Sequence, residues 1–373
     1  MRVLFAGGGT GGHLYPGLAI ARALVRADSR IEPFFVGARR GVERDVLPGA
    51  EFPFLLLELH PVYRSRLWEN WRTLAGAGAA WRAVGGLLRA ERPALVVGTG
   101  GYASGATLAR AVTARIPVVL QEQNSYPGIT TRLFARWAHE IYLGYGEAAA
   151  RLHPRAGAWV GETGNPIAPP PDPRPDRAAA RREWGFPALG GVVALVVGGS
   201  QGSRALNDTV AAFVDRGMPD AMYVIWATGR GSHERYAHLE TERLRIVPYL
   251  APIERAYAAT DLAVTRAGAL TTGELCAWGI PSILVPLPTA AADHQSANAR
   301  VLAAAGAAVQ VPQSEFTALR LDTELRRLAG DRMLRASMAA AAAARGRPQA
   351  AETIARRIMD LLARSAVARE AGP

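Results

Sequence analysis

The chain has 373 residues, 49% hydrophobic and 20% charged, which is ordinary for a globular protein and long enough for two α/β domains. It carries 43 arginines and no lysine against 32 acidic residues, so a Walker A site and Schiff-base chemistry are excluded. The single Cys276, which we expect to be buried, excludes an intramolecular disulfide, and the net charge of +11 favours phosphate-rich partners.

The first half of the chain alternates short apolar strands with helices. Helices are predicted over residues 16–27 and 104–114. The predicted strands are 3–6, 33–36, 94–97 and 118–120. Continuous apolar strands separated by helices favour a parallel sheet that is covered on both faces.

Residues 63–92 interleave arginines with Trp68, Trp71 and Trp81. Indole rings and guanidinium groups on one helix are typical of a membrane interface, where they meet the headgroups and phosphates. The alternative is an ordinary helix that packs its apolar side on the core and leaves its arginines in water. We favour the interfacial interpretation.

A proline-rich segment at 166–175 interrupts the alternation of strands and helices and predicts a stiff linker. Strands are predicted again at 192–197, 222–227, 245–247, 262–265 and 282–285. An amphipathic helix over 353–364 is expected to pack back across the domain junction.

This organisation predicts an α/β protein with two doubly wound Rossmann-like domains that face each other across a cleft. The expected parts are an N-terminal domain at 1–163, a linker at 164–176, a C-terminal domain at 177–349 and a final helix at 350–373. A strand and a glycine loop begin almost at Met1, so we expect no signal peptide. No uncharged apolar run reaches the length of a membrane span, and the expected compartment is the cytoplasm.

Three glycine-rich loops, at 7–13, 98–105 and 198–203, each follow a predicted strand and precede a helix. A glycine turn at the carboxyl end of a strand presents backbone N–H groups and the positive end of a helix dipole. Such loops are suited to phosphate. Two in the first half and one in the second indicate two nucleotide-type halves.

Two other functions fit single loops. The first loop matches the dinucleotide fingerprint, but residues 37–40 after the second strand hold no carboxylate for a ribose, which disfavours an NAD enzyme. The third loop has the spacing of a hydrolase nucleophile elbow around Ser200, and Asp261 and His294 are available downstream as partners. A phosphate contact for Ser200 is the simpler interpretation.

Several polar side chains stand at predicted strand ends or helix starts. His13 lies where the first loop becomes a helix and can act as a base, although capping that helix is the structural alternative. Glu122 and Asn124 follow the strand at 118–120, and Glu274 lies one turn into a later helix, where a carboxylate can hold both ribose hydroxyls. No Asp-x-Asp pair stands at a strand end and no cluster has metal-ligand spacing, so if a nucleotide diphosphate leaves during a reaction, helix N-termini and arginines must stabilise it.

Six short motifs occur in a fixed order along the chain: residues 8–13, 98–102, 122–124, 164–166, 198–202 and 269–274. Together they resemble the peptidoglycan N-acetylglucosaminyltransferases of glycosyltransferase family 28, the MurG family, over nearly the whole length. The resemblance implies the GT-B fold.

It also implies transfer of GlcNAc from UDP-GlcNAc to the 4-hydroxyl of MurNAc in lipid I, the undecaprenyl-diphosphate-linked MurNAc-pentapeptide. The product would be lipid II, formed with inversion and without a metal or other cofactor. Such a protein would be peripheral at the cytoplasmic face of the inner membrane. It would serve peptidoglycan synthesis, and through it cell shape and division, with no nucleic-acid partner.

Carried onto this sequence, the resemblance assigns His13 as the preferred base and Glu122 as the second candidate. Residues implied to contact the donor are Thr10, Gly11, Gly12, Asn124, Ser200, Leu250, Ala269, Leu270, Thr271, Thr272, Gly273, Glu274 and Gln295. Residues implied to hold the acceptor diphosphate are Gly8, Gly9, Gly100, Gly101 and Tyr102. Trp68, Trp71, Trp81 and neighbouring arginines would face the anionic membrane.

One departure stands out. The family usually continues its Gly-Asn-Pro motif with Val-Arg, and the arginine helps to bind the donor diphosphate. This chain has Ala168 at that position, with Arg266 and Arg174 as possible substitutes.

Three alternative functions stay open: a related GT-B enzyme with another lipid or polyketide acceptor, a serine hydrolase, and a non-catalytic basic membrane-binding protein.

Overall fold

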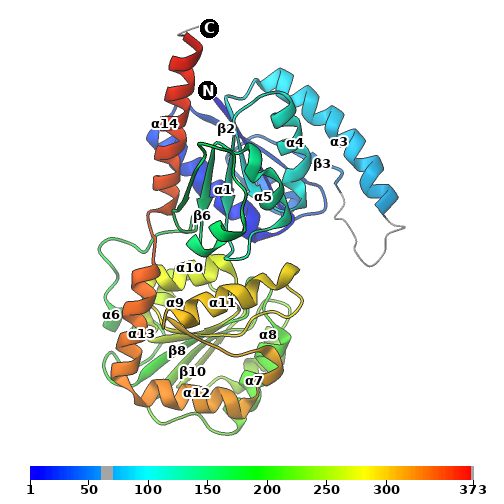
Figure 1. The fold of residues 1–373 in the computed structure, drawn as a ribbon. Helices are drawn as coiled ribbons and strands as arrows, with labels where there is room; N and C mark the ends of the chain where they lie inside the picture. Colours follow the sequence, from blue (N-terminus) through cyan, green and yellow to red (C-terminus); the bar gives the residue numbers. More distant parts are fainter. Residues whose placement is uncertain (60–69, 371–373) are drawn as a thin grey trace. The chain divides into compact units, whose positions relative to one another are not determined.

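Two units, each built around a parallel sheet, make up the chain (Figure 1). The computed structural model describes residues 1–59 and 70–370, with side chains described except at 70–77 and 366–370. The first unit comprises residues 1–167 and 349–373, and the second comprises 168–348. This is the doubly wound α/β architecture that the strand and helix pattern predicts.

The first unit has a seven-stranded sheet in the order β3-β2-β1-β4-β5-β6-β7. Its strands are β1 (Arg2–Gly7), β2 (Glu32–Ala38), β3 (Phe54–Leu57), β4 (Leu95–Gly100), β5 (Val118–Glu122), β6 (Glu140–Leu143) and β7 (Trp159–Glu162). Its helices are α1 (Gly11–Ala27), α2 (Glu43–Val46), α3 (Asn70–Glu91), α4 (Gly105–Thr113), α5 (Ile129–Phe134) and α14 (Ala350–Glu370). Short 3₁₀ turns are η1 (Leu47–Gly49), η3 (Tyr102–Ser104), η4 (Ala135–Trp137) and η5 (Gly146–Arg151).

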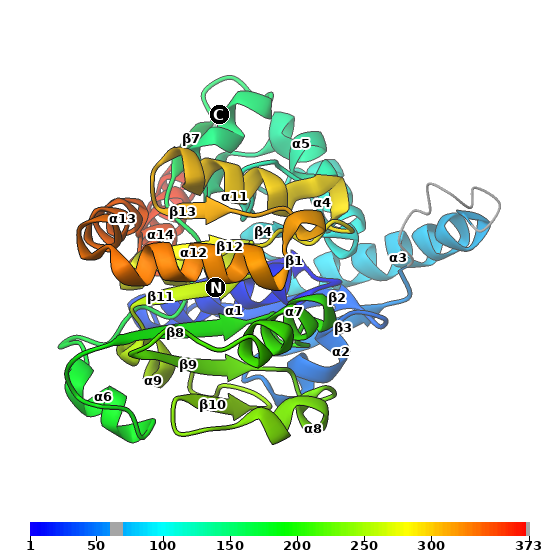
Figure 2. The same cartoon turned by 90° about the horizontal axis from the view of Figure 1, so that it is seen from below.

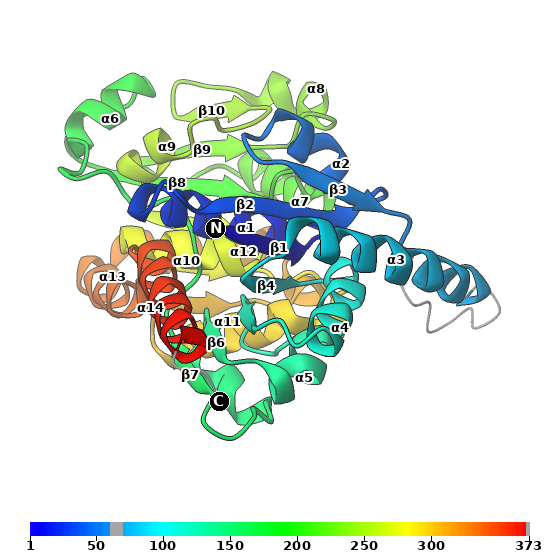
Figure 3. The same ribbon diagram turned by 90° about the horizontal axis from the view of Figure 1, so that it is seen from above.

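Both faces of this sheet are buried, as the continuous apolar strands require. Alternate residues of β1 point to opposite faces, so Phe5 belongs to one core and Leu4 to the other. Helices α1 and α14 cover the Phe5 face. Helices α3, α4 and α5 contribute to the Leu4 core, and Figure 3 shows α3 alongside α4.

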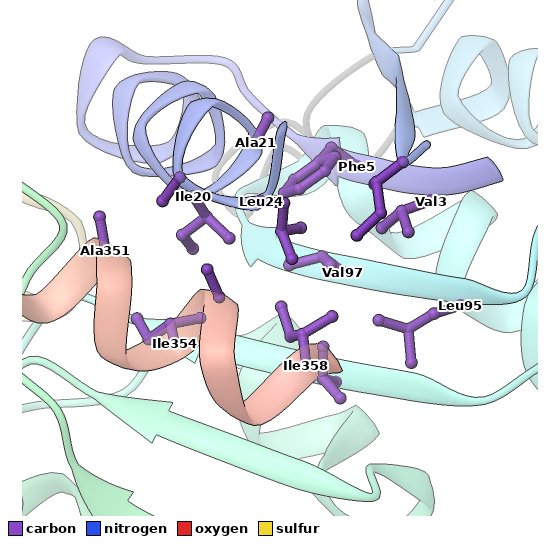
Figure 4. Close-up of a cluster of buried hydrophobic side chains, with 14 of the residues drawn as sticks. Val3, Phe5, Ile20, Ala21, Leu24, Leu95, Val97, Ala351, Ile354 and Ile358 are labelled. Atoms are coloured by element: carbon purple, nitrogen blue, oxygen red, sulfur yellow. The ribbon is translucent and has the colours of Figure 1, made fainter. Parts of the chain in front are cut away.

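The last helix of the chain, α14, packs against the first helix, α1. Ile354 and Ile358 are fully buried beside Leu24 and Val97 (Figure 4). A buried carboxylate adds a polar clamp: Arg357 Nε and Arg364 Nη2 donate to Glu140 at 2.7 and 3.0 Å. The C-terminal helix therefore completes the core of the unit that begins the chain.

The second unit has a six-stranded sheet in the order β10-β9-β8-β11-β12-β13, visible edge to edge in Figure 2. Its strands are β8 (Val192–Val197), β9 (Met222–Ala227), β10 (Leu244–Val247), β11 (Leu262–Thr265), β12 (Ser282–Leu284) and β13 (Ala308–Gln310). Its helices are α6 (Arg177–Glu183), α7 (Arg204–Asp215), α8 (His233–Tyr236), α9 (Glu254–Ala259), α10 (Ala269–Trp278), α11 (His294–Ala304), α12 (Ala318–Gly330) and α13 (Arg332–Arg345). Its 3₁₀ turns are η6 (Ala237–Leu239), η7 (Ala291–Asp293) and η8 (Gln313–Glu315).

The two faces of this sheet are covered by different helices, just as in the first unit. Helices α7 and α12 bury their apolar sides on one face, and α9 and α10 on the other. The buried Cys276 lies in α10, and burial raises the pKa of its thiol to about 11. It is an inert packing residue.

The structure adds elements that the sequence pattern did not predict. Strands β3, β6, β7 and β13 are short, and β6 carries the charged Glu140. Helix α1 begins at Gly11, five residues before the predicted start at 16. Trp68 and the side chain of Trp71 lie outside the described residues, whereas Trp81 is described and is 39% exposed.

The boundary between the units falls after Ile167, inside the segment predicted as a linker at 164–176. Asn165 and Ile167 are buried, so the beginning of that segment belongs to the first unit. None of the described helices is long and apolar enough to cross a membrane.

We expect Ile358→Ala to lower the free energy of unfolding of the first unit by roughly 3 kcal/mol, because it opens a cavity in the fully buried α1–α14 contact. Urea denaturation followed by circular dichroism measures the change. Asp360→Ala, on the exposed side of the same helix, is the control and should change stability little. Equal effects of the two substitutions would contradict the assigned packing.

Candidate functional site

The predicted site residues gather at the carboxyl ends of the central strands, once in each unit. In the first unit they follow β1, β4 and β5, and in the second they follow β8, β11 and β12, except that Leu250 follows the edge strand β10. The carboxyl edge of an open parallel sheet is where α/β proteins bind ligands.

The first two glycine loops interlock, and their glycines make room for protein atoms. Gly8 N–H donates to Gly100 O at 3.3 Å. A Cβ at Gly9 would lie 2.7 Å from the Tyr102 ring, and one at Gly101 would lie 2.0 Å from Gly8 O. Gly9, Gly100 and Gly101 also have positive φ angles, which favour glycine.

A buried carboxylate that the sequence analysis missed holds the first loop. Glu43 is fully buried, and its Oε1 accepts from Gly9 N–H at 2.9 Å and from Ala38 N–H at 3.0 Å. Its Oε2 has no partner among the described residues. Glu43, in α2, is thus a structural carboxylate that ties the first loop to the end of β2, and its burial leaves it out of reach of a ribose.

Two backbone amides remain unused at the start of α1. Thr10 is the exposed N-cap residue, and its side chain does not cap the helix. Within the described part of the chain, no acceptor bonds the N–H groups of Gly11 and Gly12. The start of this 17-residue helix therefore presents free N–H donors and the positive end of its dipole, an arrangement that suits an anion.

His13 lies between the two loops, half-buried. Its Nδ1 is 3.0 Å from Gln123 Oε1 and 3.2 Å from Thr99 O. A Cβ on Gly100 would approach the imidazole at 3.1 Å, and one on Gly101 at 3.0 Å, so both glycines accommodate this ring. The imidazole is held in place by contacts with the second loop and the end of β5.

Glu122 is the last residue of β5 and is buried, with 2% exposure. Its Oε1 accepts from Asn124 N–H at 3.0 Å, and its Oε2 accepts from Gly128 N–H at 3.0 Å. Asn124 Nδ2 donates to the same carboxylate at 3.3 Å. These bonds shape the turn into α5, so both oxygens already serve the protein.

The third glycine loop leads into α7, and its helix cap is Ser203 rather than Ser200. Ser203 Oγ accepts from Leu206 N–H at 3.4 Å, whereas Ser200 is exposed in the preceding turn. Gly202 has φ of +74°, and a Cβ there would lie 2.2 Å from Thr228 O, so glycine is required by the backbone approach.

Arg266 places a cation beneath the third loop. Its guanidinium donates to Ser203 Oγ and Gln313 Oε1, each at 2.7 Å, and to the carbonyls of Val285 and Pro286. Burial lowers its pKa to about 10, so it remains charged near neutrality. No carboxylate pairs with it among the described side chains, so its charge is not neutralised within the unit.

Arg174, the other possible substitute for the family arginine, is engaged elsewhere. It donates to Trp278 O and Ala277 O at 3.0 and 2.9 Å and lies over the Trp278 ring. Both carbonyls belong to the C-terminal end of α10, at the opposite end from Ala269. Of the two arginines, only Arg266 lies by a glycine loop.

Glu274 lies in the middle of α10 and has one protein partner, since Tyr257 OH donates to its Oε2 at 2.7 Å. Burial is the main cause that raises the pKa of Glu274 to about 7, with nearby Glu254 adding to the rise and the Tyr257 bond opposing it. The pKa of Tyr257 is itself raised well above 10, chiefly by burial. This carboxyl group therefore titrates near neutral pH.

Three other predicted donor residues, Thr272, Gln295 and Leu250, have side chains with contacts inside the second unit. Thr272 is buried and its Oγ1 donates back to Gly268 O, so its side chain is a helix contact. Gln295 Oε1 accepts from Leu287 N–H at 3.0 Å, which braces the loop after β12. Leu250 is buried, 8% exposed, in the second-unit core. The first five residues of α10 are Ala269, Leu270, Thr271, Thr272 and Gly273.

The serine hydrolase alternative is excluded by strand geometry. Asp261 precedes β11 and lies at the amino end of β8, where its Oδ2 accepts from Val193 N–H at 2.7 Å. Ser200 follows the carboxyl end of the same strand. Asp261 is also paired with Arg181 at 2.5 Å, so a triad cannot assemble.

Sequence reasoning missed Glu43, Gln123 and Tyr257. Gln123 belongs to the motif at 122–124, from which the sequence analysis predicted only Glu122 and Asn124 as site residues. Its position two residues after Gln121 could have indicated that both amides point to the same side of an extended segment. Glu43 and Tyr257 gave no local signal, because their partners are distant along the chain. Among the described residues, no group of three His, Cys, Asp or Glu side chains is arranged to hold a metal.

Sequence profiles of glycosyltransferase family 28 match both units: the N-terminal domain profile covers residues 3–143 and the C-terminal domain profile covers 193–354. The crystal structure of Acinetobacter baumannii MurG is similar, with a TM-score of 0.76 and 26% identity over 96% of this chain and 99% of that one. The glycosyltransferase of kitacinnamycin, with a TM-score of 0.70 over 97% of this chain and 98% of its own but 14% identity, shares the fold alone.

Curated relatives match from end to end. One from Symbiobacterium thermophilum is 38% identical over 378 residues, covering 100% of this chain and 99% of its own. One from Moorella thermoacetica is 40% identical, covering 95% and 97%. Both are named UDP-N-acetylglucosamine--N-acetylmuramyl-(pentapeptide) pyrophosphoryl-undecaprenol N-acetylglucosamine transferase. The chain therefore belongs to glycosyltransferase family 28 and has its two-domain GT-B fold.

Proposed function

We propose that this protein transfers GlcNAc from UDP-GlcNAc to the 4-hydroxyl of MurNAc in undecaprenyl-diphosphate-linked MurNAc-pentapeptide, converting lipid I into lipid II. The observation that carries the proposal is the end-to-end similarity to transferases so named, at 38 and 40% identity. The two anion-binding helix ends, α1 in the first unit and α10 in the second, suit a reaction between two diphosphates.

The donor contacts of the second unit start at α10. Glu274 accepts hydrogen bonds from the ribose hydroxyls, and the amides of Leu270 and Thr271 meet the diphosphate. Ser200 and Gln295 approach from neighbouring loops, and Leu250 offers its backbone to the uracil. The unpaired cation of Arg266 stabilises the departing UDP through the loop that it supports, in place of the family arginine missing at Ala168.

The acceptor diphosphate binds in the first unit. The amides of Gly8 and Gly9 are occupied by Gly100 O and Glu43. We therefore assign the phosphate contacts to the free amides of Gly11 and Gly12, with Tyr102 and the glycines at 100–101 forming the wall beside them. This assignment moves Gly11 and Gly12 from the donor contacts that the sequence predicts to the acceptor, while contacts of Thr10 and Asn124 with the donor stay a prediction.

His13 is the base in this proposal, because the oxygens of Glu122 already accept three hydrogen bonds. The acceptor O4 loses its proton to His13 and forms a bond to C1 of GlcNAc. The C1–O bond to UDP breaks, and UDP leaves with the electron pair. A single displacement of this kind inverts the anomeric centre.

The test of the function is UDP release from UDP-GlcNAc with and without a short-chain lipid I analogue, with EDTA present. We expect acceptor-dependent release that survives chelation. His13→Asn should lower kcat by about 100- to 1000-fold while UDP-GlcNAc affinity stays the same, because a base acts on the acceptor. Binding of UDP-GlcNAc without turnover would refute the proposed acceptor, and full activity of His13→Asn would refute the base.

Donor affinity should fall as the pH drops below about 7, because the ribose hydroxyls require ionised Glu274 and its raised pKa makes protonation compete. The expected loss is about tenfold for each pH unit below 7. Calorimetry with UDP-GlcNAc, whose diphosphate diester stays ionised in this range, measures it. Glu274→Gln should bind weakly and without this pH dependence. Equal wild-type affinity at pH 6 and pH 8 would contradict the assignment.

We further propose that the first unit binds the cytoplasmic face of the inner membrane through its helices α3, α4 and α5. Trp81 is exposed and packs under Arg110 at 5.0 Å. Ile129, Leu133 and Trp137 recur every four residues along α5 and η4 and are 54, 47 and 40% exposed. Arginines 132 and 136 lie between these residues in the sequence and suit anionic headgroups. We therefore add these five residues to the predicted membrane interface of Trp68, Trp71 and Trp81.

The variant Leu133→Ser with Trp137→Ser should weaken binding to anionic phospholipid vesicles by about tenfold, because two large apolar side chains no longer enter the interface. Co-sedimentation measures the binding, and unchanged UDP-GlcNAc affinity shows that the fold is intact. Leu189→Ser, at a leucine that is 83% exposed in the second unit, is the matched control. Equal vesicle binding by all three proteins would contradict the interface.

A further inference from the structure

A chain of buried amide side chains runs behind His13. Gln121 is fully buried, and Gln123 and Asn165 are 2 and 5% exposed. Gln121 Nε2 donates to Asn165 Oδ1 at 3.4 Å, and Gln123 Nε2 contacts Gln121 Oε1. We call Gln121, Gln123 and Asn165 the amide relay.

Backbone groups fix the direction of the Gln123 amide. Its Nε2 lies 2.8 Å from Thr99 O and 3.3 Å from Gln121 O, and carbonyl oxygens can only accept. The NH₂ group must therefore face these carbonyls, which leaves Oε1 on the opposite side, 3.0 Å from His13 Nδ1. Asn165 Nδ2 holds the same segment by donating to Gln123 O at 3.0 Å.

The same logic fixes the proton on His13. Its Nδ1 faces two acceptors, Gln123 Oε1 at 3.0 Å and Thr99 O at 3.2 Å, and neither of them can donate in this arrangement. A neutral imidazole carries one N–H, so that hydrogen belongs on Nδ1. The lone pair is then on Nε2.

The ring also has little freedom to turn away from this arrangement. Its Nδ1 edge lies against Gly100 and its Cδ2 against Gly101, where even a Cβ would come within 3.1 and 3.0 Å. Both glycines have positive φ angles, 92° and 77°, a backbone conformation that residues with a side chain rarely adopt. The relay and the loop together select one tautomer and one ring orientation.

We propose that Gln123 is a positioning residue that holds His13 as the Nδ1–H tautomer, so that Nε2 is the atom that accepts the proton of the acceptor hydroxyl. The proposal rests on the assignment of His13 as base. It gives Asn165, in the Gly-Asn-Pro motif, a role in the relay. Because Gln123 is neutral, it orients the imidazole without stabilising the protonated ring as a carboxylate would.

The first measurement needs no substrate. Two-dimensional ¹⁵N–¹H spectra of labelled protein distinguish protonated from unprotonated imidazole nitrogens, and loss of one signal set in His13→Asn assigns His13 among the seven histidines. We expect wild type to show protonated Nδ1 and unprotonated Nε2, and Gln123→Met, which removes the acceptor, to show both tautomers. A wild-type Nε2–H tautomer overturns the proposal whatever the activity.

Kinetics then separate positioning from structural support. Gln123→Met should lower kcat by about 10- to 100-fold with an unchanged KM for UDP-GlcNAc. Gln123→Glu keeps an acceptor at Nδ1 and adds a charge that favours imidazolium, so the acid limb of the pH–rate profile should move to higher pH. Gln349→Glu, at an exposed residue of the same unit, controls for added charge.

An unmoved acid limb in Gln123→Glu overturns the proposal, as does wild-type activity of Gln123→Met. If the tautomer is as expected but His13→Asn retains full turnover, the base assignment fails and the relay remains a structural observation. The two failures are thus distinguishable.

Discussion

The bond between the buried Glu43 carboxylate and the Gly9 amide determines the geometry of the first unit's site. It joins the first loop to the end of β2, where the same oxygen accepts from Ala38 N–H. With the loop held in this way, α1 starts at Gly11 and presents two unused amides. Burying a carboxylate is costly, and the two N–H groups that donate to its Oε1 offset part of that cost.

Glycine-rich loops are usually interpreted as leaving room for a ligand, but in the first unit several of these glycines leave room for other protein atoms. Glycines 9, 100 and 101 give room to Tyr102, to the His13 ring and to Gly8 O. In the first unit the glycines therefore let two loops and one imidazole pack in a small volume. In the proposed function, the N–H groups at the start of α1, rather than the glycine amides of the first loop, bind the anion.

Much of the architecture could be predicted, because β1, β4 and β8 are continuous apolar runs followed by glycine turns. Strand β6 could not, since Glu140 is acceptable there only because Arg357 and Arg364 return from the far end of the chain. In the site, His13 and Glu274 stood at helix positions that carry chemistry. Gln123 was not predicted, although it follows the end of β5 two residues after Gln121. Its role depends on Thr99 and His13, which no local pattern connects to it.

The return of α14 to the first unit also sets an order of events during synthesis. The α1 face that receives Ile354 and Ile358 is made early, but its covering helix α14 is made only after the whole second unit. The second unit, residues 168–348, is contiguous and has all its strands before α14 appears. The first unit thus buries this face of its core only after the second unit has been made, and in a nascent protein the apolar α1 surface stays uncovered until α14 emerges.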